Sequence, residues 1–483
     1  MEAGPPDAGP IESGPVDAGP LDAGPLDAGP LDAGPVDAGP DPGPLGLSVI
    51  ATLASPATVR VQGIEAADTT SAYLVGYFDG ELTIPGDATI DTEVRRGFLL
   101  RMDTSGAVPW SHVLEGRLAN GLEQVDGDNT GVVVAGTFRE QVSIAGGRIE
   151  TGDDSDTPDV LVAALLPDGG FRWSAALTSP ETLTTSALRR WHDRVRMGGQ
   201  YRGTVADAML PTASTLDAYV VTLSAGTGAI ETSRSFALSS PGRDDVFAIE
   251  PSDPTSEAAY WVAGEHGGTS DAGVIGVLGE PTRSRDGFVH SRRVATDEEF
   301  WGITIGGSSS DLVTGLARIS NSEVVLGMTA SGNIMTGGES GGLSGGLNVG
   351  VVQRRGGDQG TVIDWTRLFG EDGGGVEVVD VVAQGGSVWV AGTFTTATDF
   401  GLGSVAVTGS RDSFLVELAA ADGSTLNVHQ IQGVMDEVVT DIDIDTAGNV
   451  WVSGWFTGRL DRPGDTPLEA MGVDGFVARV RVP

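Results

Sequence analysis

Gly448–Phe456 reads GNVWVSGWF, and Trp389–Phe394 (WVAGTF) and Val133–Phe138 (VVAGTF) repeat the core of that segment. Each is a short run of apolar residues that ends in glycine followed closely by an aromatic residue. Runs of this length, rich in β-branched and aromatic residues and bounded by turn residues, predict β-strands rather than helices. Because the segment recurs along most of the chain, it decides the fold class.

The recurring glycine marks a repeat of even length. Its spacings along the chain are 60, 63, 65, 63, 65 and 62 residues. The glycines are Gly76, Gly136, Gly199, Gly264, Gly327, Gly392 and Gly454. Each repeat holds about four short β segments separated by turns, which predicts an all-β, seven-bladed β-propeller with four-stranded blades. Separate sandwich domains are disfavoured, because about 63 residues is short for them and no disulfide compensates.

The two ends of the repeat region predict how the ring closes. The last repeat stops soon after DGFVARV (Asp474–Val480) and lacks a final strand, whereas GLSVIATL (Gly46–Leu53) precedes the first repeat as an extra strand. We expect this N-terminal strand to complete the last blade, because pairing would remove two exposed sheet edges. The predicted propeller therefore spans residues 46–483, with the closing strand at 46–53.

Residues 1–45 differ in kind from the rest of the chain. They repeat VDAGP and LDAGP, and they contain 11 of the 25 prolines and no basic residue. Proline at every fifth position disfavours helix, and alanine and glycine offer little apolar area to bury. The segment is predicted to be a disordered spacer.

Charge and cysteine content exclude several classes of function. The chain has 67 acidic and 28 basic residues, a net charge of −39, and no cysteine. Nucleic-acid binding is not expected, because phosphate contacts need a basic surface. Thiolate metal sites and disulfide scaffolds are excluded. The sequence contains no apolar run near the roughly 18 residues of a membrane-spanning helix.

One acidic cluster is a candidate metal site. In VTDIDIDTAGN, Asp441, Asp443 and Asp445 alternate with isoleucine, which predicts three carboxylates on one strand face. Such carboxylates, with carbonyls of the next turn, would suit calcium. The alternative is a solvated strand end that leads into the turn. No catalytic constellation and no other cofactor site is predicted.

Two tryptophans are candidates for contact with a ligand. Trp261, Trp389 and Trp451 share one position of the repeat with Tyr73, and repetition at a fixed position favours packing between blades. Trp191 and Trp455 depart from this pattern. We therefore predict that they are the better candidates for an exposed binding surface.

The repeat resembles the bacterial seven-bladed β-propeller repeat family. The resemblance covers Gly46–Pro483, and its signature residues match best in the final repeat, at Gly448, Asn449, Gly454, Asp474 and Phe476. The DAGP tract is similar to spacers that follow the lipid-attached cysteine of bacterial surface lipoproteins, although neither that cysteine nor a signal region is present. The resemblance implies an extracytoplasmic bacterial protein, on the cell surface or secreted.

The leading hypothesis is a non-enzymatic, monomeric module that binds a protein or glycan partner, tethered by lipid in an unprocessed form. One alternative is a polysaccharide hydrolase or lyase with its site at the channel mouth, where paired carboxylates would serve as acid and base. Another alternative, an intracellular scaffold, follows if Met1 is the natural start.

Overall fold

The computed structural model describes residues 46–481 except 87–88, 151–156, 237–241, 254–258, 268–276, 279–284, 294–298, 308–309, 332–333, 337–338, 342–347, 357–361, 371–373 and 463–464. Pro44–Pro483 form one compact unit. The predicted spacer at residues 1–45 lies outside the described residues. Within the described ranges all regular elements are β-strands, and no helix there has the length and apolarity needed to cross a membrane.

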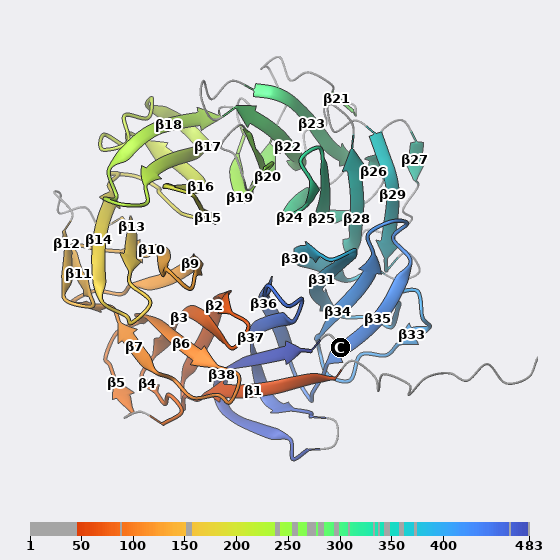
Figure 1. Ribbon diagram of the computed structural model, residues 1–483, viewed down its shortest axis with the longest axis horizontal. Helices are drawn as coiled ribbons and strands as arrows, with labels where there is room; N and C mark the ends of the chain where they lie inside the picture. Colours follow the sequence, from red (N-terminus) through yellow and green to blue (C-terminus); the bar gives the residue numbers. More distant parts are fainter. Residues whose placement is uncertain are drawn as a thin grey trace, which may run out of the picture. The chain divides into compact units, whose positions relative to one another are not determined.

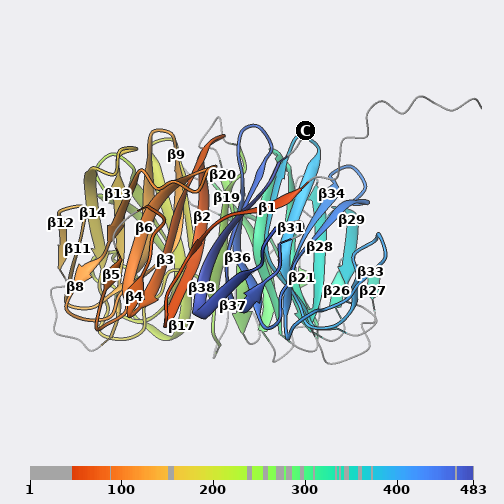
Figure 2. The ribbon, with the colours of Figure 1, turned by 90° about the horizontal axis from the view of Figure 1, so that it is seen from below.

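The sheets of this unit are arranged radially around a central axis, as in a β-propeller (Figure 1). Seen from the side, neighbouring sheets stand next to one another with their strands running along that axis (Figure 2). The innermost strands are β2 (Thr58–Asp68), β9 (Gly121–Asp128), β15 (Ala187–Trp191), β19 (Asp245–Pro251), β24 (Asp311–Ser320), β30 (Val376–Gln384) and β36 (Glu437–Ile444). Each contacts the innermost strand of the next sheet, and β36 contacts β2, so the inner ring is closed.

Each innermost strand pairs antiparallel with a second strand, which pairs with a third. The second strands are β3 (Ser71–Asp79), β10 (Gly131–Phe138), β16 (Arg194–Gly203), β20 (Ala259–Gly267), β25 (Glu323–Ser331), β31 (Ser387–Phe394) and β37 (Val450–Leu460). The third strands are β6 (Arg96–Asp103), β13 (Asp159–Leu165), β17 (Ala213–Ser224), β22 (Arg285–Arg293), β28 (Asn348–Gly356), β34 (Asp412–Ala419) and β38 (Leu468–Val480).

Outer strands complete the sheets, and short strands decorate the connections. The outer strands are β7 (Trp110–Val113), β14 (Phe171–Leu177), β18 (Ile230–Phe236), β23 (Glu299–Gly307), β29 (Val362–Phe369), β35 (Thr425–Ile431) and β1 (Leu47–Leu53). The short strands are β4 (Glu81–Leu82), β5 (Ile90–Asp91), β8 (Glu115–Gly116), β11 (Gln141–Ile144), β12 (Gly147–Glu150), β21 (Val277–Leu278), β26 (Ile334–Thr336), β27 (Glu339–Gly341), β32 (Thr398–Asp399) and β33 (Ser404–Val405).

The hydrophobic core lies between neighbouring sheets. One cluster joins Val133 of β10 to Met197 of β16, and another joins Trp389 of β31 to Val452 of β37. The second strands are therefore covered on both faces, and β31 is buried at every position after Ser387. This explains why they read as continuous apolar runs rather than as alternating ones.

The repeated glycine is required by the close approach of the innermost strand. A Cβ atom on Gly454 would overlap the carbonyl oxygen of Val438 in β36 and the ring of Phe476 in β38. The same overlap with an innermost-strand carbonyl would occur at the equivalent glycines Gly76, Gly136, Gly264 and Gly392, and at Gly199 the carbonyl is that of Thr184, just before β15. The glycine thus lets two backbones meet where the innermost strand bulges.

The N-terminal strand pairs with the C-terminal sheet. β1 lies antiparallel to β38, from Leu47 opposite Val480 to Leu53 opposite Gly475. Leu53 is fully buried there, and the amide of Ser55 donates to Asp474. The predicted pairing of the N-terminal strand with the last repeat is confirmed.

Candidate functional site

The innermost strands enclose a central channel with a cavity of about 520 Å³. All of them contribute to its lining. Because these strands come from repeats that extend from Thr58 to Ile444, the channel brings together residues that are far apart in the sequence. A concave site built by convergent elements is the default place to look for ligand binding.

Charged side chains occupy one level of this channel. The level is defined by register: each residue lies opposite the second-strand position that holds Tyr73, Trp261, Trp389 and Trp451. Around the channel the level reads Glu65, Asp126, Arg189, Glu250, Arg318, Val382 and Asp443, which we call the charged ring. Asp380 and Asp441 lie in the same cavity beside it.

Arg189 organises one half of the charged ring. Its Nη1 lies 3.3 Å from Oδ2 of Asp126, and its Nε lies 3.3 Å from Oε2 of Glu250. Asp126 comes from β9 and Glu250 from β19, the strands on either side of β15. The Glu250 carboxylate is the main cause of the raised pKa of Arg189, so the guanidinium group stays charged despite its enclosure.

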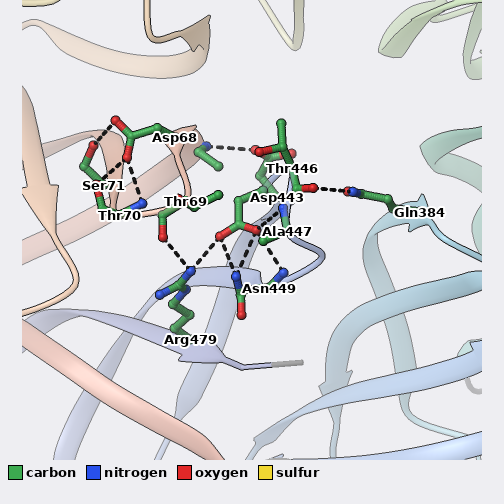
Figure 3. Close-up of polar contacts among 12 residues, drawn as sticks. Asp68, Thr69, Thr70, Ser71, Gln384, Asp443, Thr446, Ala447, Asn449 and Arg479 are labelled. Atoms are coloured by element: carbon green, nitrogen blue, oxygen red, sulfur yellow. Dashed lines mark hydrogen bonds and ion pairs between the residues drawn. The ribbon is translucent and has the colours of Figure 1, made fainter. Parts of the chain in front are cut away.

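Asp441 and Asp443 join the last sheet to the first. Oδ2 of Asp441 accepts a 2.8 Å hydrogen bond from the amide of Ile64. Oδ2 of Asp443, which is labelled in Figure 3, accepts one of 2.8 Å from the amide of Ala66. Burial raises the pKa of Asp441 to about 7 and that of Asp443 to about 6, although these amide bonds favour the ionised forms. Asp441 and Asp443 therefore link the last sheet to the first, and their carboxyl groups titrate at a higher pH than usual.

Glu65 and Asp380 are two further carboxyl groups of the channel with raised pKa values, which the charge of Arg189 offsets only in part. Burial, and next the charge of Asp443, raise the pKa of Glu65 well above its ordinary value. Burial and Asp441 do the same for the pKa of Asp380, whose carboxyl group shares a hydrogen bond with Asp441. Among the described residues, the Glu65 carboxyl group has no hydrogen-bond or ion-pair partner.

The structure separates Asp445 from the other two predicted calcium ligands. β36 ends at Ile444, so Asp445 lies in the following turn, where it accepts hydrogen bonds from the amides of Ala447 and Asn449. Arg479 Nη2 also reaches its Oδ2 at 2.6 Å and donates to the carbonyl of Thr69 (Figure 3). The prediction of three carboxylates on one strand face is wrong. Within the described part of the chain, no three His, Asp or Glu side chains have the arrangement of a metal site.

Neither of the two tryptophans predicted to contact a ligand forms an open platform. Trp191 is 7% exposed, and the guanidinium of Arg196 lies 3.9 Å from its ring centroid. The prediction of an exposed Trp191 is wrong, because the end of β15 packs against the next sheet. Trp455 is partly buried beneath Arg60, whose guanidinium lies 4.1 Å from its ring. The prediction that Trp261, Trp389, Trp451 and Tyr73 pack is confirmed, since each is at most 2% exposed.

Most of the charged ring was not identified from the sequence. Glu65, Asp126, Arg189, Glu250 and Arg318 occur in different repeats and form no local motif. A usable signal was present, because each lies near the end of a β segment that precedes a repeated glycine. Turns of different length between these segments and the glycines hide the common register.

Comparisons with known proteins identify no family for this chain. No protein-family model and no curated protein matches it. Similar solved structures include BamB from Moraxella catarrhalis, with 12% identity, a TM-score of 0.41, and 89% of this chain and 99% of that chain covered. A quinohemoprotein alcohol dehydrogenase from Comamonas testosteroni has 10% identity and a TM-score of 0.41, with 91% and 78% covered. The Dos1 propeller has 9% identity and a TM-score of 0.42, with 89% and 94% covered. These values assign neither a relative nor an activity.

Proposed function

We propose that this protein is a non-enzymatic interaction module whose binding site is the central channel. The observation that carries the proposal is the charged ring, whose members line the cavity from every innermost strand except β9, where Asp126 pairs with Arg189 instead. Together with Asp380 and Asp441, five carboxyl groups line this space beside two guanidinium groups, those of Arg189 and Arg318. Enclosed carboxyl groups in such excess favour a ligand that supplies positive charge.

The partner that this channel suits is a protein with a positively charged loop or terminus. The chain carries a net charge of −39, so the attraction extends beyond the channel and accelerates association at low salt. A glycan partner would need aromatic platforms, and the tryptophans discussed above are covered by neighbouring side chains. The protein partner is therefore favoured over the glycan.

The proposal includes an architecture and a location. The sheet order supports seven blades, one for each innermost strand, with β1 completing the last. The DAGP tract supports a tether to a bacterial cell surface, with the propeller acting as a monomer outside the cytoplasm. A −39 charge opposes self-association, which is consistent with a monomer.

The test is affinity capture of periplasmic and surface proteins on the immobilised chain, compared between two charge-matched variants. Glu65→Gln/Asp380→Asn neutralises two channel carboxyl groups. Glu181→Gln/Asp465→Asn neutralises two exposed ones, with side chains 46% and 63% exposed. We expect the channel variant to lose a partner that the wild type and the control retain, with or without a calcium chelator. Identical capture by both variants would contradict a channel site.

A second candidate function is a polysaccharide hydrolase or lyase. It is favoured by one observation: burial raises the pKa values of two carboxyl groups, Asp441 and Asp443, that line the same cavity. A carboxyl group with a raised pKa beside a second carboxyl group is typical of acid and base pairs. Release of reducing ends or unsaturated sugars from a panel of acidic and neutral polysaccharides, lost in Asp441→Asn, would support this function.

A further inference from the structure

We propose that the half of the channel formed by Glu65, Asp443 and Asp380 binds one guanidinium group of an incoming ligand. This inference rests on the proposed channel site and adds the chemistry of the group that enters it. The guanidinium group could belong to a small molecule or to an arginine side chain at the tip of a partner. Both sources present the same planar cation to the ring.

The first argument comes from the other half of the ring, which already holds a guanidinium group. Arg189 lies between Asp126 and Glu250, at 3.3 Å from each, and these acids come from the two adjacent strands. The charged ring therefore has the width and charge to hold this group through carboxylates of neighbouring sheets. Planar guanidinium suits such sites because its five N–H donors point outward in one plane.

The second argument is Glu65, whose partly buried carboxyl group lines the channel and has no hydrogen-bond or ion-pair partner among the described residues. Asp443 is its neighbour, because the amide of Ala66, the next residue after Glu65, donates to Asp443 Oδ2. Two neighbouring carboxylates repel each other unless one is protonated or a cation joins them. Their position marks the place that the guanidinium group of the ligand would take.

An organic cation fits this half of the channel better than calcium does. Asp441 and Asp443 each use one oxygen on a backbone amide of β2, which leaves few oxygens for the six to eight contacts that calcium takes. The acids are also spread over separate strands rather than gathered in one loop. A guanidinium group, with its donors spaced around a plane, can reach carboxylates in such an arrangement.

Protons compete with the cation for these carboxyl groups. Raised pKa values mean that the free channel holds protons near neutral pH, and these must leave when a guanidinium group binds. Affinity should therefore rise from pH 5.5 to pH 8. The charged and titratable groups that face the site from the packed strands are Glu65 of β2, Asp126 of β9, Arg189 of β15, Glu250 of β19, Arg318 of β24, Asp380 of β30, and Asp441 and Asp443 of β36.

The test is isothermal titration calorimetry of the full chain at low salt, with Nα-acetyl-arginine amide as the probe and Nα-acetyl-citrulline amide as its neutral isostere. We expect binding of the arginine probe, with proton release measured in buffers of different ionisation enthalpy, and no binding of citrulline. Glu65→Gln should weaken binding by about tenfold, the size expected for one charge-assisted contact. The matched control Glu181→Gln, on an exposed acid, should change it less than twofold.

The outcomes separate this inference from the proposed function. Equal affinity in Glu65→Gln and the wild type, with both melting at the same temperature, would overturn the guanidinium site, as would equal binding of citrulline. Competition by calcium at equimolar concentration would also overturn it in favour of a metal. A peptide with one terminal arginine that binds at least tenfold more tightly than the amide would identify a protein side chain as the source, and equal affinity would identify a small molecule. Identical capture by the channel and control variants, with probe binding intact in the wild type, would count against the proposed function alone.

Discussion

The second and innermost strands of each sheet are hydrogen-bonded neighbours, yet they carry very different residues at the same register. At the level of the charged ring, the second strands present mostly large packed residues, such as Tyr73, Trp261, Trp389 and Trp451. The innermost strands present four carboxylates, two arginines and one valine. The residue type on the second strand is therefore similar in several repeats, whereas the residue type opposite it on the innermost strand varies.

Packing explains the difference. A second-strand side chain is enclosed between two neighbouring sheets, so every repeat meets the same shape requirement. An innermost side chain has the channel on one side, and no neighbour dictates its size or polarity. The second strands therefore build the ring, and the innermost strands are free to give it an individual function.

The largest expected effect concerns the packed part of the ring. A chain that begins at residue 55 lacks β1, which exposes the edge of β38 and removes buried Leu53. Compared with a chain that begins at residue 45, it should lose several kcal/mol of unfolding free energy, the order expected for a lost strand and a buried leucine. Thermal denaturation of both chains measures this, and equal melting temperatures would contradict closure by β1.

The next effect tests a single member of the packed column. Trp451 is fully buried, and the guanidinium of Arg479 lies 4.9 Å from its ring. Trp451→Ala should lower the unfolding free energy by about 3–5 kcal/mol, as a large-to-small change in a core does. Met471, on the adjacent β38 and 84% exposed, provides the control. Met471→Ala should change the unfolding free energy by less than about 0.5 kcal/mol. Similar denaturation midpoints for the two variants would mean that the column does not hold the sheets together.

An intermediate effect should distinguish the innermost strands by their response to pH. Glu437, the first residue of β36, is fully buried, and burial raises its pKa to about 8. The folded protein therefore keeps a proton that the unfolded chain releases near its ordinary value of 4.5. Between these two pH values the folded state binds more protons, so its stability must fall as pH rises, by at most about 1.4 kcal/mol per pH unit.

Glu437→Gln should remove that contribution. Urea denaturation at pH 5 and pH 8 should show the variant gaining stability relative to the wild type at pH 8, with the difference vanishing toward pH 5. Trp451→Ala, which changes no titratable group, should lower the unfolding free energy by the same amount at both pH values. A Glu437→Gln effect that does not vary with pH would mean that the carboxyl group is ionised in the folded protein.

The same division decides what could be predicted from the sequence. The repeated glycine and its apolar run were sufficient to predict the strands, the propeller and the pairing of the N-terminal strand. Close packing between sheets requires this glycine and this run in nearly every repeat, so both are visible in the sequence. The charged ring was not predictable, since Glu65, Asp126, Arg189 and Glu250 are brought level by turns of unequal length. The prediction that Asp445 shares a strand face with Asp441 and Asp443 was wrong for a local reason. Alternate residues lie on one face only while the strand continues, and β36 ends at Ile444, one residue earlier.

The smallest effect should come from charge pairs on the outside of the ring, and it sharpens the contrast with the channel. Arg202 Nε lies 2.6 Å from Oε2 of Glu181, a shorter separation than either ion pair of Arg189, but both side chains are nearly half exposed. Solvent and salt screen such a pair, so a double-mutant cycle with Arg202→Gln and Glu181→Gln should give a coupling of about 0.2–1 kcal/mol that shrinks in 0.5 M salt. The cycle of Arg189→Gln and Glu250→Gln should give a larger coupling that resists salt, since the Glu250 side chain is only 13% exposed. If the two couplings and their salt dependences were equal, the channel would be as wet as the surface, and its carboxyl groups would not need a partner cation.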